Sequence, residues 1–253
     1  MKKALLGLLN KFGVHITFTP TGRKTINKKP NFGNNIRVFE IIGPSGIGKT
    51  TFLEKLKNID DRKWLSKEEF LKCFLSNYSI NLNLGTIYES IIDELLKNIA
   101  NNIEISSIVK LQILEDYKNI IVWDYYFKIS EESLTIVLDE GIFHNFGNEI
   151  ISIKDFIKIE NRDFFKNRYI IFLEASNEYV YANLKKRQGE KKSKLFYKDI
   201  SFKEFCEKND EALMIYNSVL SFCDSMKIPV LRINIENDSN SIIKVNDFLK
   251  NAN

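Results

Sequence analysis

The stretch that most constrains the fold of this chain is a glycine-rich octapeptide at residues 43–50, which reads Gly43-Pro44-Ser45-Gly46-Ile47-Gly48-Lys49-Thr50. A short apolar run at residues 38–42 precedes it and predicts a buried strand. Apolar residues at helical spacing follow it, at Phe52, Leu53 and Leu56. The chain therefore predicts a strand, a tight turn and a helix in direct succession.

The octapeptide fits G-x-x-x-x-G-K-[ST], the phosphate-binding P-loop or Walker A pattern. Its glycines allow a tight turn whose N–H groups point at phosphate oxygens, and the following helix directs its positive end at the same anion. We expect Lys49 to reach the β- and γ-phosphates and the Thr50 hydroxyl to bind Mg²⁺. The flanking strand and helix make a chance glycine-rich turn the less favoured interpretation. The residues expected around the nucleotide are Gly43, Ser45, Gly46, Ile47, Gly48, Lys49, Thr50 and Thr51.

A second motif is an apolar, β-branched run at residues 133–138 that ends in two carboxylates, Asp139 and Glu140. This is a Walker B-like pattern, in which Asp139 is placed to bind Mg²⁺ directly or through water. A surface turn after a core strand has the same appearance. The functional interpretation of Asp139 and Glu140 therefore depends on the octapeptide.

Length, charge and the numbers of cysteines and histidines limit the kinds of protein that this chain can be. The 253 residues suffice for one core with an insertion or for two small domains. A net charge of +4 is too weak and too dispersed to indicate a nucleic-acid partner. Three widely separated cysteines indicate free thiols in a reducing compartment, so we expect a cytoplasmic protein. Two histidines exclude a histidine-rich metal site, and no segment is long enough to span a bilayer.

Along the chain, residues 1–36 form a polar lead-in after a short leucine- and lysine-rich start. We expect this start to be an amphipathic helix that packs on the domain rather than a signal peptide or a membrane-surface helix. Residues 59–130 are mostly helical in pattern, with an apolar stripe that follows Thr86 as a possible cap and a second stripe from Ile108 to Ile121. Further strands are expected at 168–176 and 228–234, and further helices at 178–186, 202–226 and 239–250.

Together these elements resemble the nucleoside and nucleoside-monophosphate kinase branch of the P-loop proteins, which includes thymidylate kinase. The matching segments are IIGPSGIGKTTFLEKL, LTIVLDEG, YIIFLEASNEYVYANLKKRQGE and PVLRINIENDSNSIIKVNDFLKN. They cover residues 37–58 and 133–250, and the first is the specific one. The resemblance implies an α/β fold of three layers, in which a parallel sheet of about five strands in kinase-type order lies between helices. It also implies ATP as phosphoryl donor and Mg²⁺ as metal.

Carried over by position, the resemblance implies that Lys49 and Thr50 hold phosphate and metal, and that Asp139 or Glu140 is the metal-linked acid or base. It makes residues 37–253 one kinase-like domain, with 59–130 as a helical insertion on the acceptor side. The resemblance also implies that residues 185–198 are a basic lid that carries Arg187, although a solvated helix end is the usual explanation for such a run. The chain departs from thymidylate kinase, which has Asp-Arg-Tyr where Asp139-Glu140-Gly141 stands. This variant is more similar to kinase-like proteins encoded with bacterial surface-polysaccharide genes.

Three functions remain open from the sequence. The first is ATP- and Mg²⁺-dependent phosphoryl transfer to a nucleoside, nucleotide or sugar, with no nucleic acid and no stable membrane anchor as partner and with a homodimer left open. The second is an ATPase that couples hydrolysis to conformational change or regulates a partner. The third is a degenerate nucleotide-binding module. Strand order separates the first two, because the Asp139 strand lies directly beside the P-loop strand in the kinase branch, whereas another strand lies between them in the hydrolytic machines.

Overall fold

The computed structural model describes residues 36–59, 64–74, 85–101, 106–129, 133–160, 162–189, 200–237 and 240–251. The predicted lead-in at 1–36 lies outside the described residues except for Ile36. The predicted lid at 185–198 is described only as far as Gly189.

A parallel sheet forms the centre of the described structure. Its five strands are β1 (Arg37–Ile42), β2 (Leu65–Ser66), β3 (Thr135–Leu138), β4 (Arg168–Glu174) and β5 (Val230–Asn234). The strand order is β2-β3-β1-β4-β5, and every neighbouring pair is parallel. The predicted α/β fold with a parallel sheet of about five strands is thus confirmed. The strand that precedes Asp139 lies directly beside β1, with Phe39 opposite Val137.

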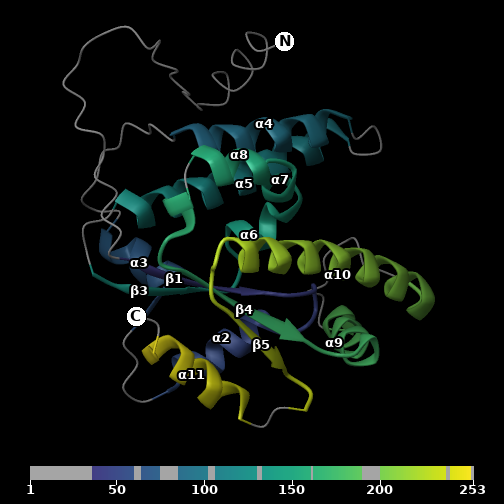
Figure 1. Cartoon of the computed structure of the whole chain (residues 1–253). Helices are drawn as coiled ribbons and strands as arrows, with labels where there is room; N and C mark the ends of the chain where they lie inside the picture. Colours follow the sequence, from purple (N-terminus) through teal and green to yellow (C-terminus); the bar gives the residue numbers. More distant parts are fainter. Residues whose placement is uncertain are drawn as a thin grey trace, which may run out of the picture.

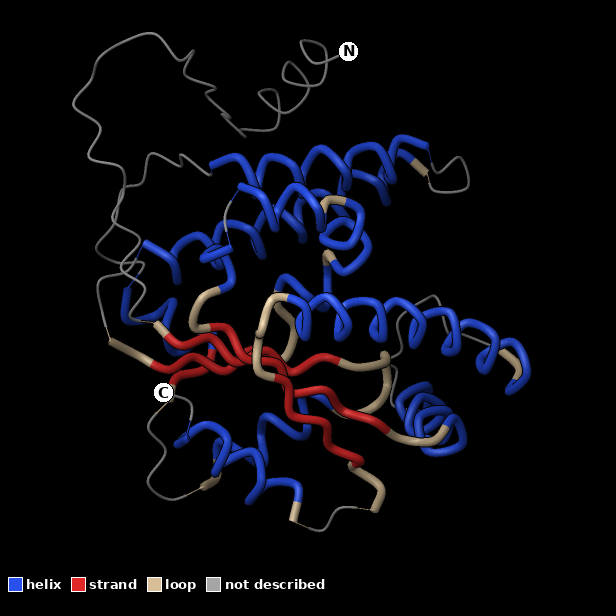
Figure 2. Tube along the Cα trace, viewed as in Figure 1, coloured by secondary structure: helices blue, strands red, loops and turns tan. Residues whose placement is uncertain are grey.

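Helices cover both faces of this sheet (Figures 1 and 2). On one face lie α2 (Lys49–Lys57) and α11 (Ser241–Asn251), and on the other lies α10 (Phe202–Ser225). The side chains of β4 show why both faces are covered. Tyr169, Ile171 and Leu173 belong to the core with α2 and α11, whereas Ile170 and Phe172 belong to the core with α10. Successive strand residues point to opposite faces, so a continuously apolar strand requires cover on both.

The block expected to be helical contains α3 (Lys67–Phe74), α4 (Gly85–Asn101) and α5 (Ser107–Ile129). The predicted stripe of α4 is buried at Ile87, Ile91, Leu95 and Ile99. The helix predicted from the second stripe is present as α5, but the prediction that its apolar residues are buried is wrong for the first turns, where Ile108 is 78% exposed. Thr86 lies within α4 rather than before it, since the helix begins at Gly85. The two-residue strand β2 was also missed, because it is too short to show alternation.

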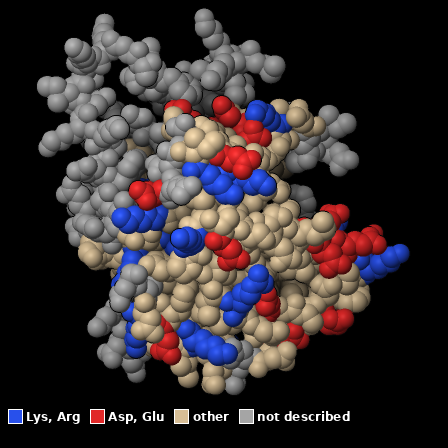
Figure 3. Space-filling view, viewed as in Figure 1, with Lys and Arg blue, Asp and Glu red and all other residues tan. Residues whose placement is uncertain are grey.

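Between β3 and β4 the chain forms three short helices, α6 (Ile142–Asn145), α7 (Gly147–Ser152) and α8 (Lys154–Glu160), and the 3₁₀ helix η2 (Arg162–Phe165). Helix α9 (Asn177–Gly189) follows β4 and extends the predicted helix 178–186. Within the described ranges, none of the helices has the length and apolar character needed to cross a membrane. On the face shown in Figure 3, acidic and basic side chains are interspersed.

Candidate functional site

The predicted site residues meet at the carboxyl ends of β1 and β3, two adjacent parallel strands. The glycine-rich turn, residues 43–48, connects β1 to α2, and the Asp139-Glu140-Gly141 turn connects β3 to α6. Parallel pairing places both turns at the same edge of the sheet, which is where open α/β sheets bind ligands.

The glycine-rich turn has positive φ angles, which favour glycine, at Gly43, Gly46 and Gly48. Gly43 has φ 147°, and a Cβ there would lie 2.8 Å from the Leu173 carbonyl oxygen. Gly48 has φ 104° and immediately precedes α2, and a Cβ on it would meet nothing within 4 Å. Gly48 has no side chain that could cap α2, and the first turn of α2 carries no acidic residue. The positive end of a nine-residue helix therefore adjoins open space, an arrangement that suits an anion.

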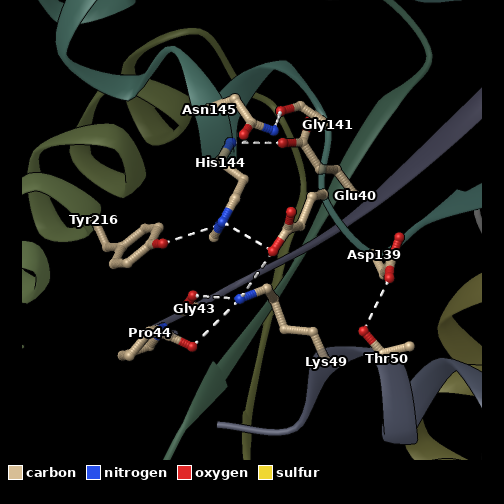
Figure 4. A network of polar contacts seen from close by, with 11 residues as sticks. Glu40, Gly43, Pro44, Lys49, Thr50, Asp139, Gly141, His144, Asn145 and Tyr216 are labelled. Atoms are coloured by element: carbon tan, nitrogen blue, oxygen red, sulfur yellow. Dashed lines mark hydrogen bonds and ion pairs between the residues drawn. The ribbon is translucent and has the colours of Figure 1, made fainter. Parts of the chain in front are cut away.

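Lys49 lies across this turn, and its side chain is only 7% exposed. Its Nζ donates hydrogen bonds to the carbonyl oxygens of Gly43 at 3.0 Å and Pro44 at 3.3 Å. The same Nζ lies 3.7 Å from Glu140 Oε1. Figure 4 shows the ammonium group beside the carbonyl groups of Gly43 and Pro44. A positive charge is thus fixed between the two turns.

Thr50 and Asp139 form the second link between the turns. The Thr50 hydroxyl donates a hydrogen bond of 3.1 Å to Asp139 Oδ2 (Figure 4). A hydroxyl and a carboxylate in contact fit Mg²⁺, which takes oxygen ligands and usually combines one or two carboxylates with water and substrate phosphates. In the parts of the chain that the structure describes, no three His, Cys, Asp or Glu side chains could hold a metal ion by themselves. Thr50 and Asp139 could contribute two oxygen ligands to such an ion.

The other residues predicted for the site differ in burial, and the side chain of one of them is not described. Ser45 is half-buried and Thr51 is exposed. The Ile47 side chain is buried in the core, and its N–H donates to the Pro44 carbonyl at 3.3 Å. Arg187 lies in the last turn of α9, but its side chain is outside the described part of the structure. Lys185, from the same basic run, donates to the Ile200 carbonyl at 3.2 Å.

Glu40 is a buried carboxyl group that sequence reasoning did not select. It lies on β1 with no exposed surface, accepts the His144 N–H at 2.7 Å and pairs with Arg168 at 3.3 Å. Burial raises the pKa of Glu40 to about 7, although Arg168 and the His144 amide act in the opposite direction. A Cβ on Gly141 would lie 2.5 Å from the Glu40 carboxyl carbon. The turn after β3 therefore packs directly on this group, and only glycine fits at 141.

A buried polar network extends from Glu40 to the helical block. Arg168 pairs through its other terminal nitrogen with Asp124 on α5. The Tyr88 hydroxyl on α4 donates to Asp124 at 2.6 Å. All four side chains are at most 3% exposed. The network thus joins α4 and α5 to the strand that leads into the glycine-rich turn.

His144 was also missed, and it contacts both a site residue and a core residue. Its Nε2 lies 3.4 Å from Glu140 Oε1, and its Nδ1 lies 2.9 Å from the Tyr216 hydroxyl oxygen. The spacing of four residues between Glu140 and His144 was a signal in the sequence. For Glu40, the corresponding signal in the sequence was a charged residue within an otherwise apolar strand. Tyr216 had no local signal, because α10 reaches the site only through the tertiary fold.

A shallow hollow adjoins Glu140 on the side of the helical block. It is lined by Lys67, Ile120, Trp123, Asp124, Phe127, Leu138, Glu140, Gly141 and Ile142. The Lys67 Nζ lies over the Trp123 ring, 4.3 Å from its centroid. The hollow thus connects the Glu140 turn with α3 and α5.

Two comparisons with known proteins were negative. A scan against protein-family models finds no match for the sequence, and a search of curated proteins finds none either.

Proposed function

We propose that this protein is an ATP- and Mg²⁺-dependent phosphotransferase that acts on a small-molecule acceptor. The observation that carries the proposal is the meeting of two turns from adjacent strands. Lys49 and Thr50, which begin α2 directly after the first turn, contact Glu140 and Asp139, respectively, in the second. One cation and two carboxylates thus surround the open end of α2, and phosphoryl transfer needs this kind of electrostatic positioning more than covalent help.

The sheet order favours a kinase over a hydrolytic machine. The strand that carries Asp139 is the direct neighbour of β1, and no strand lies between them. This is the order expected of the kinase branch. The ATPase alternative expects another strand at this position.

The two carboxylates have different neighbours, and we assign them different roles. Asp139 accepts the Thr50 hydroxyl, so these two residues would hold Mg²⁺, which neutralises phosphate charge when bound with ATP. Glu140 is 41% exposed and lines the hollow, so it is the group that can meet an acceptor. When the acceptor is a hydroxyl, as in a nucleoside or sugar, it gives its proton to Glu140 as its oxygen bonds to the γ-phosphorus. The bond from that phosphorus to the bridging oxygen breaks, and ADP leaves with the electron pair.

The hollow beside Glu140 is our candidate for the acceptor side. Lys67 follows β2 directly, and Trp123 lies on α5, so both belong to the block that the sequence assigned to the acceptor. The Lys67 ammonium covers the Trp123 ring in this structure, so a polar ring compound would have to displace Lys67 in order to stack there. Nucleosides, nucleotides and sugars all satisfy this description.

The test is transfer of label from ATP labelled at the γ-phosphate, with Mg²⁺ and a panel of nucleosides, nucleotides and sugars. We expect label in at least one acceptor. We also expect Glu140→Gln to lower the transfer rate about 10²- to 10⁴-fold, the usual contribution of a positioned base. Glu115→Gln, which changes an exposed glutamate of α5, is the matched control. Label found only in inorganic phosphate, at a rate that no acceptor changes, would contradict the proposal and favour the ATPase.

A further inference from the structure

His144 is held in place by three contacts from three different elements. Its backbone N–H on α6 donates to Glu40 on β1 at 2.7 Å. Its Nδ1 lies 2.9 Å from the Tyr216 hydroxyl on α10 (Figure 4). Its Nε2 lies 3.4 Å from Glu140 Oε1, in the turn after β3. The imidazole side chain is 14% exposed, so it is largely enclosed beside an open site.

Glu140 needs such support because its own side chain is 41% exposed. A glutamate with that exposure samples several rotamers, and an isolated surface ion pair holds it only weakly. Here two nitrogens face the same carboxylate oxygen. Lys49 Nζ lies 3.7 Å from Oε1, and His144 Nε2 lies 3.4 Å from it. These two contacts at Oε1 restrict the rotamers of the carboxylate and therefore the direction of the other oxygen, Oε2.

We propose that His144 and Tyr216 are positioning residues that hold the Glu140 carboxylate where Oε2 takes the proton of the acceptor. This inference rests on the proposed phosphotransferase function and extends it to two residues outside both turns. His144 itself neither gives nor takes the transferred proton. Its effect is on the geometry of Glu140, and small displacements of a reacting group reduce rates strongly.

The tautomer of His144 follows from its two neighbours. A neutral imidazole donates from only one nitrogen. With the hydrogen on Nε2, the ring donates toward the Glu140 carboxylate, and Nδ1 accepts from the Tyr216 hydroxyl. This tautomer makes both contacts attractive. Tyr216 is well placed to fix it, because its side chain is 8% exposed and its ring packs 5.8 Å from that of Phe172 on β4.

The turn that carries Glu140 is fixed at its base as well. Glu40 touches both ends of the segment from Gly141 to His144, by close packing at Gly141 and by the hydrogen bond to the His144 N–H. Arg168 holds Glu40 from the opposite side. The freedom that remains in the turn is therefore mainly that of the Glu140 side chain, which is the part that His144 contacts.

The activity test uses Mg²⁺·ATP with water as the acceptor, since ADP release needs no identified substrate, and it measures nucleotide affinity separately by competition with a fluorescent ATP analogue. We expect His144→Phe to lower kcat about 10- to 100-fold, the size of effect that misplacement of a reacting group produces. Nucleotide affinity and Tm should stay near wild type. Tyr216→Phe should act in the same direction with a smaller effect, and His144→Gln, which keeps an N–H donor, should recover part of the rate.

The matched control is Tyr169→Phe, since Tyr169 is as buried as Tyr216 (7% and 8% exposed) but packs on the opposite face of the sheet. An unchanged kcat in His144→Phe would overturn the inference. So would an equal loss of nucleotide affinity, or a His144→Gln variant no better than His144→Phe.

A second readout is independent of turnover. The chain has two histidines, so His15→Gln leaves His144 as the source of the imidazole ¹H–¹⁵N signals. We expect the Nε2 signal to shift in Glu140→Gln and the Nδ1 signal to shift in Tyr216→Phe. If neither signal moves, the contacts do not exist in solution and the inference is wrong. A wild-type protein that shows these shifts but neither hydrolyses ATP nor transfers its phosphate contradicts the proposed function, whereas normal turnover with unchanged signals contradicts this inference alone.

Discussion

At the scale of single residues, Asp139 and Glu140 are consecutive in the chain but have separate neighbours. Asp139 accepts the Thr50 hydroxyl at 3.1 Å, and Glu140 lies between Lys49 and His144. Successive residues after a strand point in different directions, so one turn can serve a metal and an acceptor at once.

Asp139→Asn should raise the Mg²⁺ concentration needed for half-maximal nucleotide turnover by about tenfold or more, because a neutral amide is a poorer ligand for a hard cation. The measurement is a Mg²⁺ titration of ADP release at saturating ATP. Asp155→Asn, at an exposed aspartate of α8, is the control. A Mg²⁺ curve that does not move in Asp139→Asn would make this carboxylate structural.

Glu40 gives a prediction for stability against pH. Burial raises its pKa from 4.5 to about 7, so the folded protein binds this proton more tightly than the unfolded chain does. The stabilisation is complete below about pH 4.5 and is lost as pH rises through 7. The free energy of unfolding of wild type should therefore fall relative to that of Glu40→Gln between these two values.

Urea unfolding of wild type and Glu40→Gln at several pH values measures this difference. Glu54→Gln, at an exposed glutamate of α2, should show a difference from wild type that changes little over the same range. A wild type that gains stability relative to Glu40→Gln as pH rises would show that the Arg168 pair outweighs burial.

The sequence identified the residues of the two turns because their chemistry is local. A lysine and a threonine follow a glycine turn, and two carboxylates follow an apolar strand, so spacing alone brings them to one edge of a parallel sheet. His144, Tyr216 and Arg168 could not be selected in the same way. They come from α6, α10 and β4, and only the packing of these elements brings them to Glu140 and Glu40.

At the scale of elements, α10 illustrates how a local signal sets a boundary. The Ser201 hydroxyl accepts the Glu204 N–H at 3.2 Å, and the Glu204 carboxylate accepts the Ser201 N–H at 2.9 Å. This capping box starts the 24-residue helix that carries Tyr216. Contacts of Glu204 with Ser201 also lower the pKa of the Glu204 carboxyl.

Ser201→Ala should lower the free energy of unfolding by about 1 kcal/mol, the usual cost of losing an N-terminal cap. Urea denaturation at neutral pH measures it. Ser221→Ala is the control within the same helix, because the Ser221 hydroxyl donates only to the Asn217 carbonyl of the preceding turn. Equal effects of the two substitutions would show that the capping box adds no stability of its own.

Long helices and strands with a strong apolar pattern could be predicted from the sequence. Very short strands, and burial that depends on packing between elements, could not. β1, β4, α4 and α10 have the patterns expected of buried strands and amphipathic helices, and the structure confirms them. β2 has two residues, too few for any pattern. The first turns of α5 have apolar residues at helical spacing, but no described element covers Ile108, which is 78% exposed. Spacing predicts a helix, whereas burial depends on what packs against it.

At the scale of the whole molecule, parallel pairing of β1 and β3 brings the two turns together, and the buried network connects them to the helical block. Glu40, Arg168 and Asp124 join β1, β4 and α5, and Tyr88 adds α4. The hollow beside Glu140 is bounded by the same helix α5. The position of the candidate acceptor side relative to the sheet therefore depends on buried charges.

Arg168→Met should lower the free energy of unfolding by about 3 to 5 kcal/mol, because it leaves Glu40 and Asp124 buried without their cation. Arg232→Met is the matched control, since Arg232 also pairs with a glutamate, at 3.0 Å, but is 52% exposed. The exposed pair should contribute about 0 to 1 kcal/mol. Denaturant unfolding compares the two variants, and similar losses in both would mean that the buried network does not hold the helical block.

The role of Lys49 between the two turns is tested most directly by comparing Lys49→Ala with Lys55→Ala in Mg²⁺-dependent ATP turnover. Both substitutions remove one positive charge from α2, but Lys49 lies between the two turns and Lys55 is exposed on the helix surface. We predict that Lys49→Ala lowers turnover about 10²- to 10³-fold, as the loss of one group that stabilises developing charge does elsewhere. Lys55→Ala should turn over ATP at the wild-type rate, and both variants should fold. Wild-type turnover in a folded Lys49→Ala variant would mean that the two turns do not form a nucleotide site.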